Sequence, residues 1–191
     1  LLMKVIQLHQ KEKQLIEWAV ENNRQAQQQI YVKFSPKMLS VCRQYIKDIH
    51  HAEDVMITGF MKVFTNLKNF EHKGSFEGWI RRIMVYECID FLRVKKNNFN
   101  HQDIDDVTVS ENESVYEMED FSVDDIQNMI DNLSDGYKMV FNLYAIEGYK
   151  HQEIAEMLKI SEGTSKSQLS HARKLLQQQI TDLKNKLNGT K

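Results

Sequence analysis

The sequence predicts an all-α protein made of two small helical domains joined by a flexible acidic linker. Three observations carry this prediction. The chain has only 7 Gly and 1 Pro in 191 residues, whereas a β-sandwich or barrel of this size needs many turn residues. Apolar side chains recur at helical spacing through most of the chain. One stretch, residues 98–125, lacks any such period and separates the two periodic parts.

The charge is distributed unevenly along the chain. The formal net charge of −2 conceals a net charge of +6 over residues 1–97, −10 over residues 98–125 and +2 over residues 126–191. The middle segment contains no Lys or Arg, and its self-repulsion and scattered apolar residues are typical of a flexible tether. We therefore expect domains over residues 1–97 and 126–191. Their basic balance keeps nucleic acid among the expected partners.

The first domain is expected to be a succession of helices. An extra amphipathic N-terminal helix ends at Asn22-Asn23. Ser35-Pro36 predicts a helix restart, with Ser as N-cap and Pro at the first helical position, where its missing N–H costs nothing. Ser75 is placed to cap a long helix that ends with Arg93, Lys95 and Lys96. The expected helices cover residues 3–21, 24–34, 37–46, 52–69 and 76–96.

The second domain is also expected to be helical. Ser134 and Ser161 are placed as N-caps, and Gly148 is a typical C-terminal stop. Lys159 and Ile160 are expected to form a tight turn between the last two helices. The expected helices cover residues 124–133, 134–148, 150–158 and 161–187.

Several classes of protein are excluded by what the sequence lacks. It has no glycine-rich phosphate loop, no nucleophile elbow and no paired Cys or His at ligand spacing, so we expect no catalytic residue, no metal and no cofactor. No apolar run reaches the ~18 residues of a membrane helix, and no signal peptide is visible. Two lone cysteines, Cys42 and Cys88, fit a reducing compartment, so we expect a cytoplasmic protein without membrane insertion of its own.

Residues 153–176 have the pattern of a helix-turn-helix. A two-turn helix from Glu153 to Leu158 is followed by a tight turn and a longer helix that opens with Ser161-Glu162-Gly163-Thr164. Short polar residues and basic residues in the longer helix suit insertion into the major groove and contact with phosphates. The alternative is a plain helical hairpin with a solvated basic face.

The helix expected at residues 76–96 alternates basic and aromatic residues. Basic side chains hold phosphates, and aromatic faces stack on unpaired bases for ~1–3 kcal/mol each. The alternative is that the aromatic residues are core, and we expect this for most of them. The exposed remainder, Arg81, Arg82, Tyr86 and an edge of Trp79, is then the functional part.

These segments together resemble the extracytoplasmic-function group of bacterial RNA polymerase sigma factors, over roughly residues 22–97 and 126–180. Members of that group have two helical domains, regions two and four, joined by a flexible linker. The resemblance is carried by Ala52-Glu53-Asp54-Val55 with Phe60-Met61-Lys62-Val63-Phe64, by Phe76 to Ile83 with Ile89 to Arg93, and by Ile146 to Tyr149, Glu153 to Glu156 and Gly163 to Ser167.

The resemblance implies a non-enzymatic factor that binds the polymerase core through its β and β′ subunits, reads the −10 and −35 elements of promoter DNA, and is regulated by an anti-sigma factor. The implied core-polymerase contacts are Glu53, Asp54, Phe60 and Phe64. The implied −10 contacts are Trp79, Arg81, Arg82, Tyr86 and Arg93. The implied −35 contacts are Thr164, Ser165, Lys166, Ser167, Gln168, His171 and Arg173.

Two other functions remain open at this point. One is a free-standing helix-turn-helix regulator that binds duplex DNA without polymerase. The other is an all-α adaptor whose basic faces bind acidic proteins. Stimulation of promoter-dependent transcription distinguishes the first from a sigma factor, and a mobility shift of DNA at low salt excludes the second.

Overall fold

The computed structural model describes residues 2–98 and 122–188, with the side chains of residues 11–94 and 122–186. Within these ranges all regular structure is helical, which confirms the all-α prediction. The chain divides into two compact units, Leu1–Val94 and Lys95–Lys191, and each has its own buried apolar core. No helix of the described part has the length and apolar character needed to cross a bilayer.

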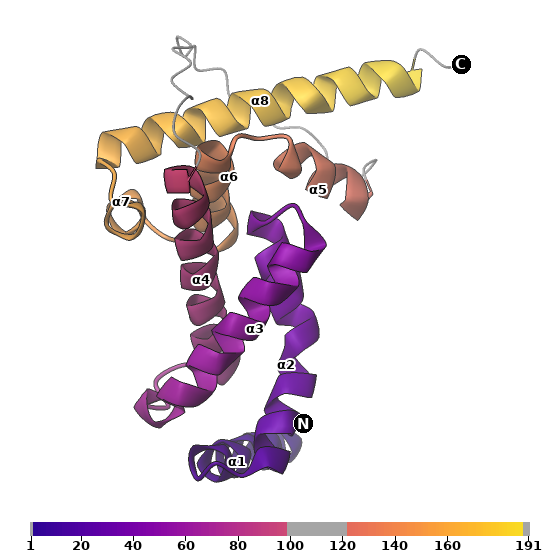
Figure 1. Ribbon diagram of the computed structural model, residues 1–191. Coiled ribbons are helices and arrows are strands. Elements are labelled where there is room, and N and C mark those ends of the chain that lie inside the picture. Colours follow the sequence, from indigo (N-terminus) through magenta and orange to yellow (C-terminus); the bar gives the residue numbers. More distant parts are fainter. Residues whose placement is uncertain (1, 99–121, 189–191) are drawn as a thin grey trace. The chain divides into compact units, whose positions relative to one another are not determined.

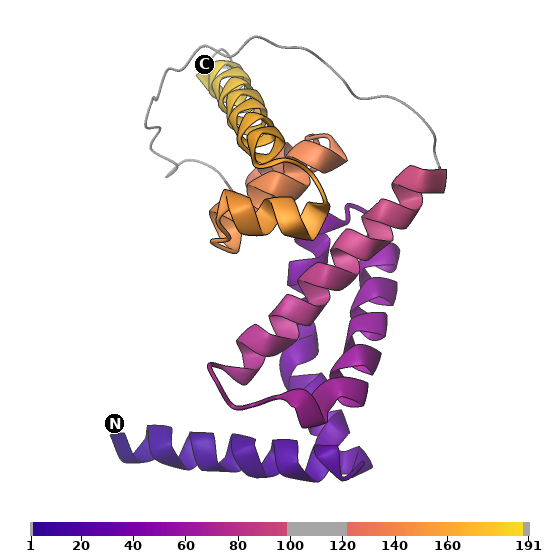
Figure 2. The same ribbon diagram turned by 90° about the vertical axis from the view of Figure 1, so that its left-hand side faces the viewer.

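The first unit is built on three long helices that lie side by side, with a fourth across one end of them (Figures 1 and 2). Helix α1 is the crossing helix, and it contacts α2 and the short 3₁₀ turn η1. Side chains on α2, α3 and α4 fill the core between these helices, among them Ile30, Met38, Val63, Ile80, Met84 and Val85. The helices are α1 (Leu2–Val20), α2 (Arg24–Tyr45), α3 (Ile49–Asn66), η1 (Leu67–Asn69) and α4 (Phe76–Asn98).

The expected helix restart at Ser35-Pro36 is wrong, because α2 continues through Pro36 without a break. Pro36 has no N–H to donate to the carbonyl of Val32, and an interior proline typically costs ~3 kcal/mol. Val32 and Pro36 lie on the exposed side of α2, where water can reach the backbone. The buried side is continuous across the proline and offsets its cost; it consists of Ile30, Phe34, Met38 and Val41.

The second unit packs three short helical segments against one long helix. Helices α6 and α7 contact the first turns of α8, and α5 contacts α8 further along (Figure 1). The core between them includes Met129, Ile130, Leu133, Val140, Leu143, Ile154, Leu169 and Ala172. The elements are α5 (Val123–Asp131), α6 (Asp135–Phe141), the π-helical turn η2 (Asn142–Ile146), α7 (His151–Leu158) and α8 (Glu162–Asn188).

A tight turn joins α7 to α8 at Lys159 and Ile160, where the sequence predicts one. Lys159 is left-handed, with φ 57°, and the N–H of Ile160 donates to the carbonyl of Ala155 at 3.1 Å. Ser161 then caps α8, its Oγ accepting from the N–H of Thr164 at 2.9 Å. The expected cap at Ser134 is only partly found: Ser134 precedes α6 with an extended backbone, but its side chain makes no capping hydrogen bond.

A buried ion pair joins α5 to α6. The Nζ of Lys138 lies 3.4 Å from Oδ1 of Asp131, and the two side chains are 4% and 1% exposed. The amide of Gln127 also donates to this oxygen, at 3.4 Å. Two opposite charges so far from water compensate each other. Removal of either side chain therefore leaves the opposite charge buried without this partner.

Candidate nucleic-acid interface

The first turns of α3 carry an exposed acidic pair, Glu53 and Asp54. Asp48 begins the helix as N-cap, where its carboxylate accepts from the backbone N–H of His51 at 2.9 Å. That hydrogen bond lowers the pKa of Asp48. The cap therefore fixes the start of α3, and the acidic pair lies exposed one turn further on, with Oε2 of Glu53 3.8 Å from Nδ1 of His50.

Two phenylalanines, Phe60 and Phe64, are expected to contact the same partner as this acidic pair, but neither side chain is fully exposed to solvent. Phe60 is 2% exposed and its ring lies edge-on against Tyr31, with centroids 4.9 Å apart. Phe64 is half-buried, and its ring centroid is 6.1 Å from that of Phe60. The prediction that Phe60 contacts a partner is therefore corrected: it follows the apolar period of α3 into the core.

Two exposed apolar side chains on α3 were not among the expected contact residues. Ile57 is 49% exposed and Met61 is 67% exposed. They lie four residues apart, and so on one side of the helix, close to Glu53 and Asp54. A signal existed, because Ile57 falls outside the apolar period that Val55 and Phe60 define, and an apolar residue outside the period is exposed.

The loop between η1 and α4 is lined by an aromatic cluster. The ring of Phe70 lies 4.8 Å from His72, 5.1 Å from Phe76 and 5.4 Å from Trp79, measured between centroids. The backbone is left-handed at His72, with φ 57°, and at Gly74, with φ 89°. Such a conformation costs a non-glycine residue ~1 kcal/mol or more and persists only where the surroundings hold it. The rings around Phe70 provide that support.

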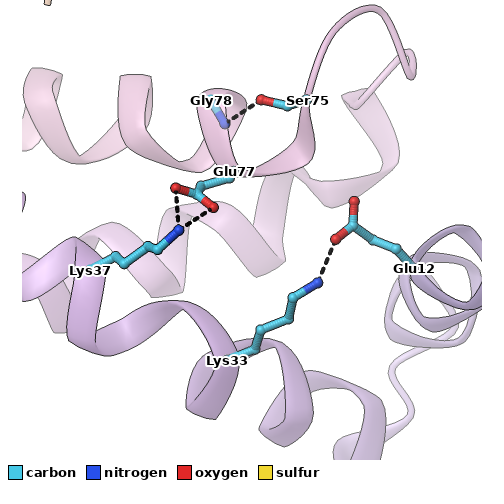
Figure 3. Close-up of polar contacts among 6 residues, drawn as sticks. All are labelled: Glu12, Lys33, Lys37, Ser75, Glu77 and Gly78. Atoms are coloured by element: carbon cyan, nitrogen blue, oxygen red, sulfur yellow. Dashed lines mark hydrogen bonds and ion pairs between the residues drawn. The ribbon is translucent and has the colours of Figure 1, made fainter. Parts of the chain in front are cut away.

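The start of α4 is fixed by a cap and an ion pair (Figure 3). Ser75 Oγ accepts from the N–H of Gly78 at 3.0 Å, as the sequence predicts. A Cβ at Gly78 would lie 2.9 Å from this oxygen, so glycine permits the close approach. Glu77 binds Lys37 of α2, whose Nζ lies 3.0 Å from both carboxylate oxygens. Helix α4 therefore enters the unit in one defined direction.

The basic and aromatic residues of α4 differ in exposure, and Phe76 is buried. Arg82 and Tyr86 are exposed, and the guanidinium carbon of Arg82 is 5.9 Å from the Tyr86 ring centroid. Arg81 and Trp79 are half-buried. Arg93 is half-buried and binds Asp90 at 2.8 Å. All five expected −10 residues therefore lie on α4, and Arg82 and Tyr86 are the exposed ones.

The first turns of α8 present polar side chains to solvent. Ser167 and Arg173 are exposed, and Thr164 is half-buried beside its cap. Lys166 is exposed and binds Glu162 at 2.8 Å. The hydrogen bond and positive charge of Lys166 lower the pKa of Glu162.

Two further expected −35 residues are held by α6. Gln168 packs against Gly136, where a Cβ would lie 3.4 Å from its amide nitrogen. His171 stacks on Tyr137, with ring centroids 5.6 Å apart and planes 25° from parallel. Both side chains are half-buried. Their stems are therefore fixed before any ligand binds.

Ser165 does not face solvent with its neighbours. It is 0% exposed and lies in the buried stripe of α8 with Leu169 and Ala172. Its Oγ lies 2.9 Å from Nδ1 of His151 on α7. The prediction that Ser165 contacts DNA is therefore corrected, and His151, which the sequence reasoning did not single out, is its partner. Within the described part, no group of three or more His, Cys, Asp or Glu side chains is placed to hold a metal ion.

Two known families match the chain, one in each of its two units. The family Sigma-70 region 2 matches residues 30–98, and the family Sigma-70, region 4 matches residues 123–176. The chain is 29% identical over 163 residues to the ECF RNA polymerase sigma factor SigW of Bacillus subtilis (strain 168), across 78% of this chain and 86% of SigW. It is 23% identical over 184 residues to the ECF RNA polymerase sigma-E factor of Haemophilus influenzae, across 88% and 95% of the two chains.

Solved structures share the fold. The sigma factor RpoE, in complex with the anti-sigma factor NepR from Bartonella quintana, has a TM-score of 0.53 at 21% identity, over 81% of this chain and 96% of RpoE. CnrH, in complex with the cytosolic domain of CnrY, has a TM-score of 0.50 at 19% identity, over 90% and 97%. The chain belongs to the sigma-70 family, in the extracytoplasmic-function group, whose members bind RNA polymerase and initiate transcription.

Proposed function

We propose that this chain brings RNA polymerase core to promoters that carry a −10 and a −35 element, reading the first with α4 and the second with α8. The observation that carries the proposal is the pairing of each family match with an exposed polar and basic helix face. Arg82 and Tyr86 form that face on α4, and Ser167 and Arg173 form it on α8. A free-standing regulator needs the second face alone and leaves the first without a role.

The exposed side of α3 is the proposed docking surface for the core. Glu53 and Asp54 supply negative charge for a basic partner surface, which steers association and fixes register. Ile57 and Met61 supply apolar area, whose burial contributes roughly 25 cal/mol per Å². The family commonly has Gln-Glu at Ile57-Thr58, so the docking surface of this chain is more apolar than usual.

Charge reversal tests the docking surface. Glu53→Lys with Asp54→Lys is expected to weaken binding to the core at least tenfold, because both side chains are exposed and neither contributes to the buried core. The matched control is Glu17→Lys with Glu21→Lys, which makes the same charge change on exposed residues of the same unit. Equal affinity of both double variants for the core, measured by fluorescence anisotropy, would refute the assignment.

The aromatic loop and α4 are the proposed −10 reader. An unpaired base needs a face to stack on, and Trp79 and Tyr86 offer such faces at ~1–3 kcal/mol per stacked base. Arg82 lies beside Tyr86 and can hold the adjoining phosphate. The cap at Ser75 and the ion pair between Lys37 and Glu77 hold this surface in place without contacting DNA themselves.

The first turns of α8 are the proposed −35 reader, in the major groove of duplex DNA. Thr164, Lys166 and Ser167 stand at the N-terminal end, where a recognition helix meets base edges. Gln168 and His171 are held against α6, so little side-chain entropy is lost when they bind. Arg173, two turns along, is placed for a phosphate.

An anti-sigma factor is the proposed regulator. The structural relative RpoE is bound to the anti-sigma factor NepR, and this chain shares its fold. The exposed side of α3 offers such a partner the same residues that we assign to the core. An anti-sigma factor of this chain is therefore expected to compete with the core, and a binding partner that leaves the affinity for the core unchanged would not be one.

Run-off transcription of fragmented genomic DNA tests the proposal as a whole. Core polymerase with this chain is expected to give discrete transcripts whose start sites share sequences ~10 and ~35 base pairs upstream. Core alone is the control. The same transcripts with and without the chain, or transcripts without shared upstream sequences, would refute the proposal.

A further inference from the structure

The contact between α7 and α8 has a polar group at its centre. Ser165 occupies the buried stripe of α8, between the turn and the apolar residues Leu169 and Ala172. Alanine or valine would fill this position without a hydroxyl to satisfy, and a buried hydroxyl without a partner costs free energy. The hydroxyl of Ser165 is satisfied by Nδ1 of His151, at 2.9 Å. This bond joins the first residue of α7 to the first turns of the proposed recognition helix.

The ring of His151 is also held on its face. It stacks on Tyr144 of η2, with ring centroids 4.6 Å apart and planes 23° from parallel. The same tyrosine ring carries Arg173, whose guanidinium carbon lies 5.7 Å from the centroid. A chain of contacts therefore runs from Ser165 through His151 and Tyr144 to Arg173, and it involves η2, α7 and α8.

The charges around His151 come from α8. Lys166 and Arg173 are positive and Glu162 is negative, and Glu162 is already bound to Lys166 at 2.8 Å. Tyr144 of η2 adds a ring without charge. Burial, and then the positive charge of Lys166, lower the pKa of His151. Burial therefore favours the uncharged imidazole, and a hydrogen bond of 2.9 Å joins its Nδ1 to the Ser165 hydroxyl.

We propose that His151 is a positioning residue of the helix-turn-helix: bound to Ser165 and stacked on Tyr144, it sets the direction of Arg173 and fixes α8 against α7 for binding to duplex DNA. The inference rests on the proposed function of α8 at the −35 element and adds to it a residue that does not read bases. His151 lies close enough to Arg173 and Lys166 to sense their charge, and this gives the positioning role a measurable signature.

The signature is a dependence of DNA affinity on pH. DNA phosphates at Lys166 and Arg173 offset the two positive charges that disfavour protonation of His151. The pKa of His151 is therefore higher in the complex than in the free protein. The complex then binds more protons, so affinity for duplex DNA rises as the pH falls through the range between the two pKa values. Each unit of difference between them is worth about tenfold in affinity.

The experiment uses the full chain and a fluorescent duplex that contains a −35 element recovered by run-off transcription. A duplex with the same bases in scrambled order measures non-selective binding. The dissociation constant is measured by anisotropy between pH 5.5 and 8, at fixed ionic strength. His151→Phe keeps a stacking ring but lacks both the ring nitrogen that bonds Ser165 and the titrating proton. It is expected to bind about fivefold more weakly at pH 7.5 and to lose the rise in affinity at acidic pH.

Two further variants separate positioning from simple loss of structure. Ser165→Ala removes the bond and keeps the titrating ring, so it is expected to weaken binding at pH 7.5 and to retain the pH dependence. His50→Gln changes an exposed histidine of the other unit and is expected to match the unaltered chain at every pH. Thermal unfolding by circular dichroism verifies that each variant is folded. Should His151→Phe fail to fold, Ser165→Ala carries the test, and normal affinity in it overturns the proposal.

A double-mutant cycle tests whether His151 acts through Arg173. In an Arg173→Ala background, His151→Phe is expected to change affinity less than twofold, because the group that it positions is gone. The same loss in both backgrounds, or an unchanged pH profile in His151→Phe, overturns the inference and leaves the −35 assignment standing. Equal binding of both duplexes by the unaltered chain overturns the −35 assignment and the inference together.

Discussion

Removal of the Lys138 side chain is expected to destabilise the second unit and leave the stability of the first unit unchanged. In Lys138→Ala the carboxylate of Asp131, whose side chain is 1% exposed, loses the cation 3.4 Å away. Gln127 remains as a neutral donor to it. Breaking a buried pair from one side costs about 3–5 kcal/mol. The free energy of unfolding of a small domain is only ~5–15 kcal/mol, so this loss is a large share of the stability of the second unit.

Urea unfolding followed by two signals measures this effect. Both tryptophans, Trp18 and Trp79, lie in the first unit, so their fluorescence reports on that unit alone, while circular dichroism reports on both. With a urea slope of ~1.5 kcal/mol per M, a loss of ~3 kcal/mol lowers the midpoint by ~2 M. In Lys138→Ala the part of the dichroism transition that belongs to the second unit is expected to shift by that amount, while the part that belongs to the first unit and the fluorescence transition stay in place.

The control replaces both partners of the pair. Lys138→Met with Asp131→Leu removes both charges together and is expected to stay within about 1.5 kcal/mol of the unaltered chain, because no unpaired charge is left. In Lys138→Ala, a shift of the urea midpoint below about 0.5 M, well under the ~2 M expected, would contradict the claim that the ion pair stabilises the second unit. An equal shift in the fluorescence transition would contradict the independence of the two units.

Three other outcomes are expected. Pro36→Ala restores a backbone donor within α2 and is expected to stabilise the first unit by about 1–2 kcal/mol; a lower urea midpoint by tryptophan fluorescence would count against the continuous helix. Ser75→Ala removes the cap of α4 and is expected to cost about 1 kcal/mol by the same measurement, and an unchanged midpoint would show that the cap is dispensable. Two hydrogen bonds from Ser122 lower the pKa of Asp125, and the one from the side chain has a larger effect than the one from the backbone. Hydrogen exchange in α5 is therefore expected to be slow above the unfolded-state pKa and to accelerate as pH falls through the lower folded-state pKa; exchange independent of pH, after correction for the intrinsic rate, would refute this.

Local chemistry was enough to predict many elements of the fold. The caps at Ser75 and Ser161 and the tight turn at Lys159 each depend on residues within a few positions, and the structure contains all three. The apolar period predicted the helices themselves. Pro36 was misjudged because a local stop signal was weighed without the buried stripe on both sides of it, and packing of that stripe outweighs the lost hydrogen bond.

The candidate sites depended on which side of each helix faces the core. Ser165 resembles its polar neighbours in chemistry, but it shares the buried side of α8 with Leu169 and Ala172. Its partner, His151, lies fourteen positions earlier in the chain, and this contact depends on the packing of α7 against α8. Phe60 belonged to the apolar period of α3, and that period predicts a core residue correctly. Ile57 and Met61 were exposed for the same reason, since they stand outside the period. Where a helix period and an expected partner contact disagreed, the period decided.

Promoter opening is the direct test of the proposal that this chain brings the polymerase core to promoters and acts at the −10 element. A promoter recovered by run-off transcription is mixed with core polymerase, with and without this chain, and permanganate is used to detect unpaired thymines. The account predicts reactive thymines around the −10 element only when both proteins are present, and their loss with Glu53→Lys and Asp54→Lys. Reactive thymines with core alone, or none with the complete mixture while the chain still binds the duplex, would contradict it.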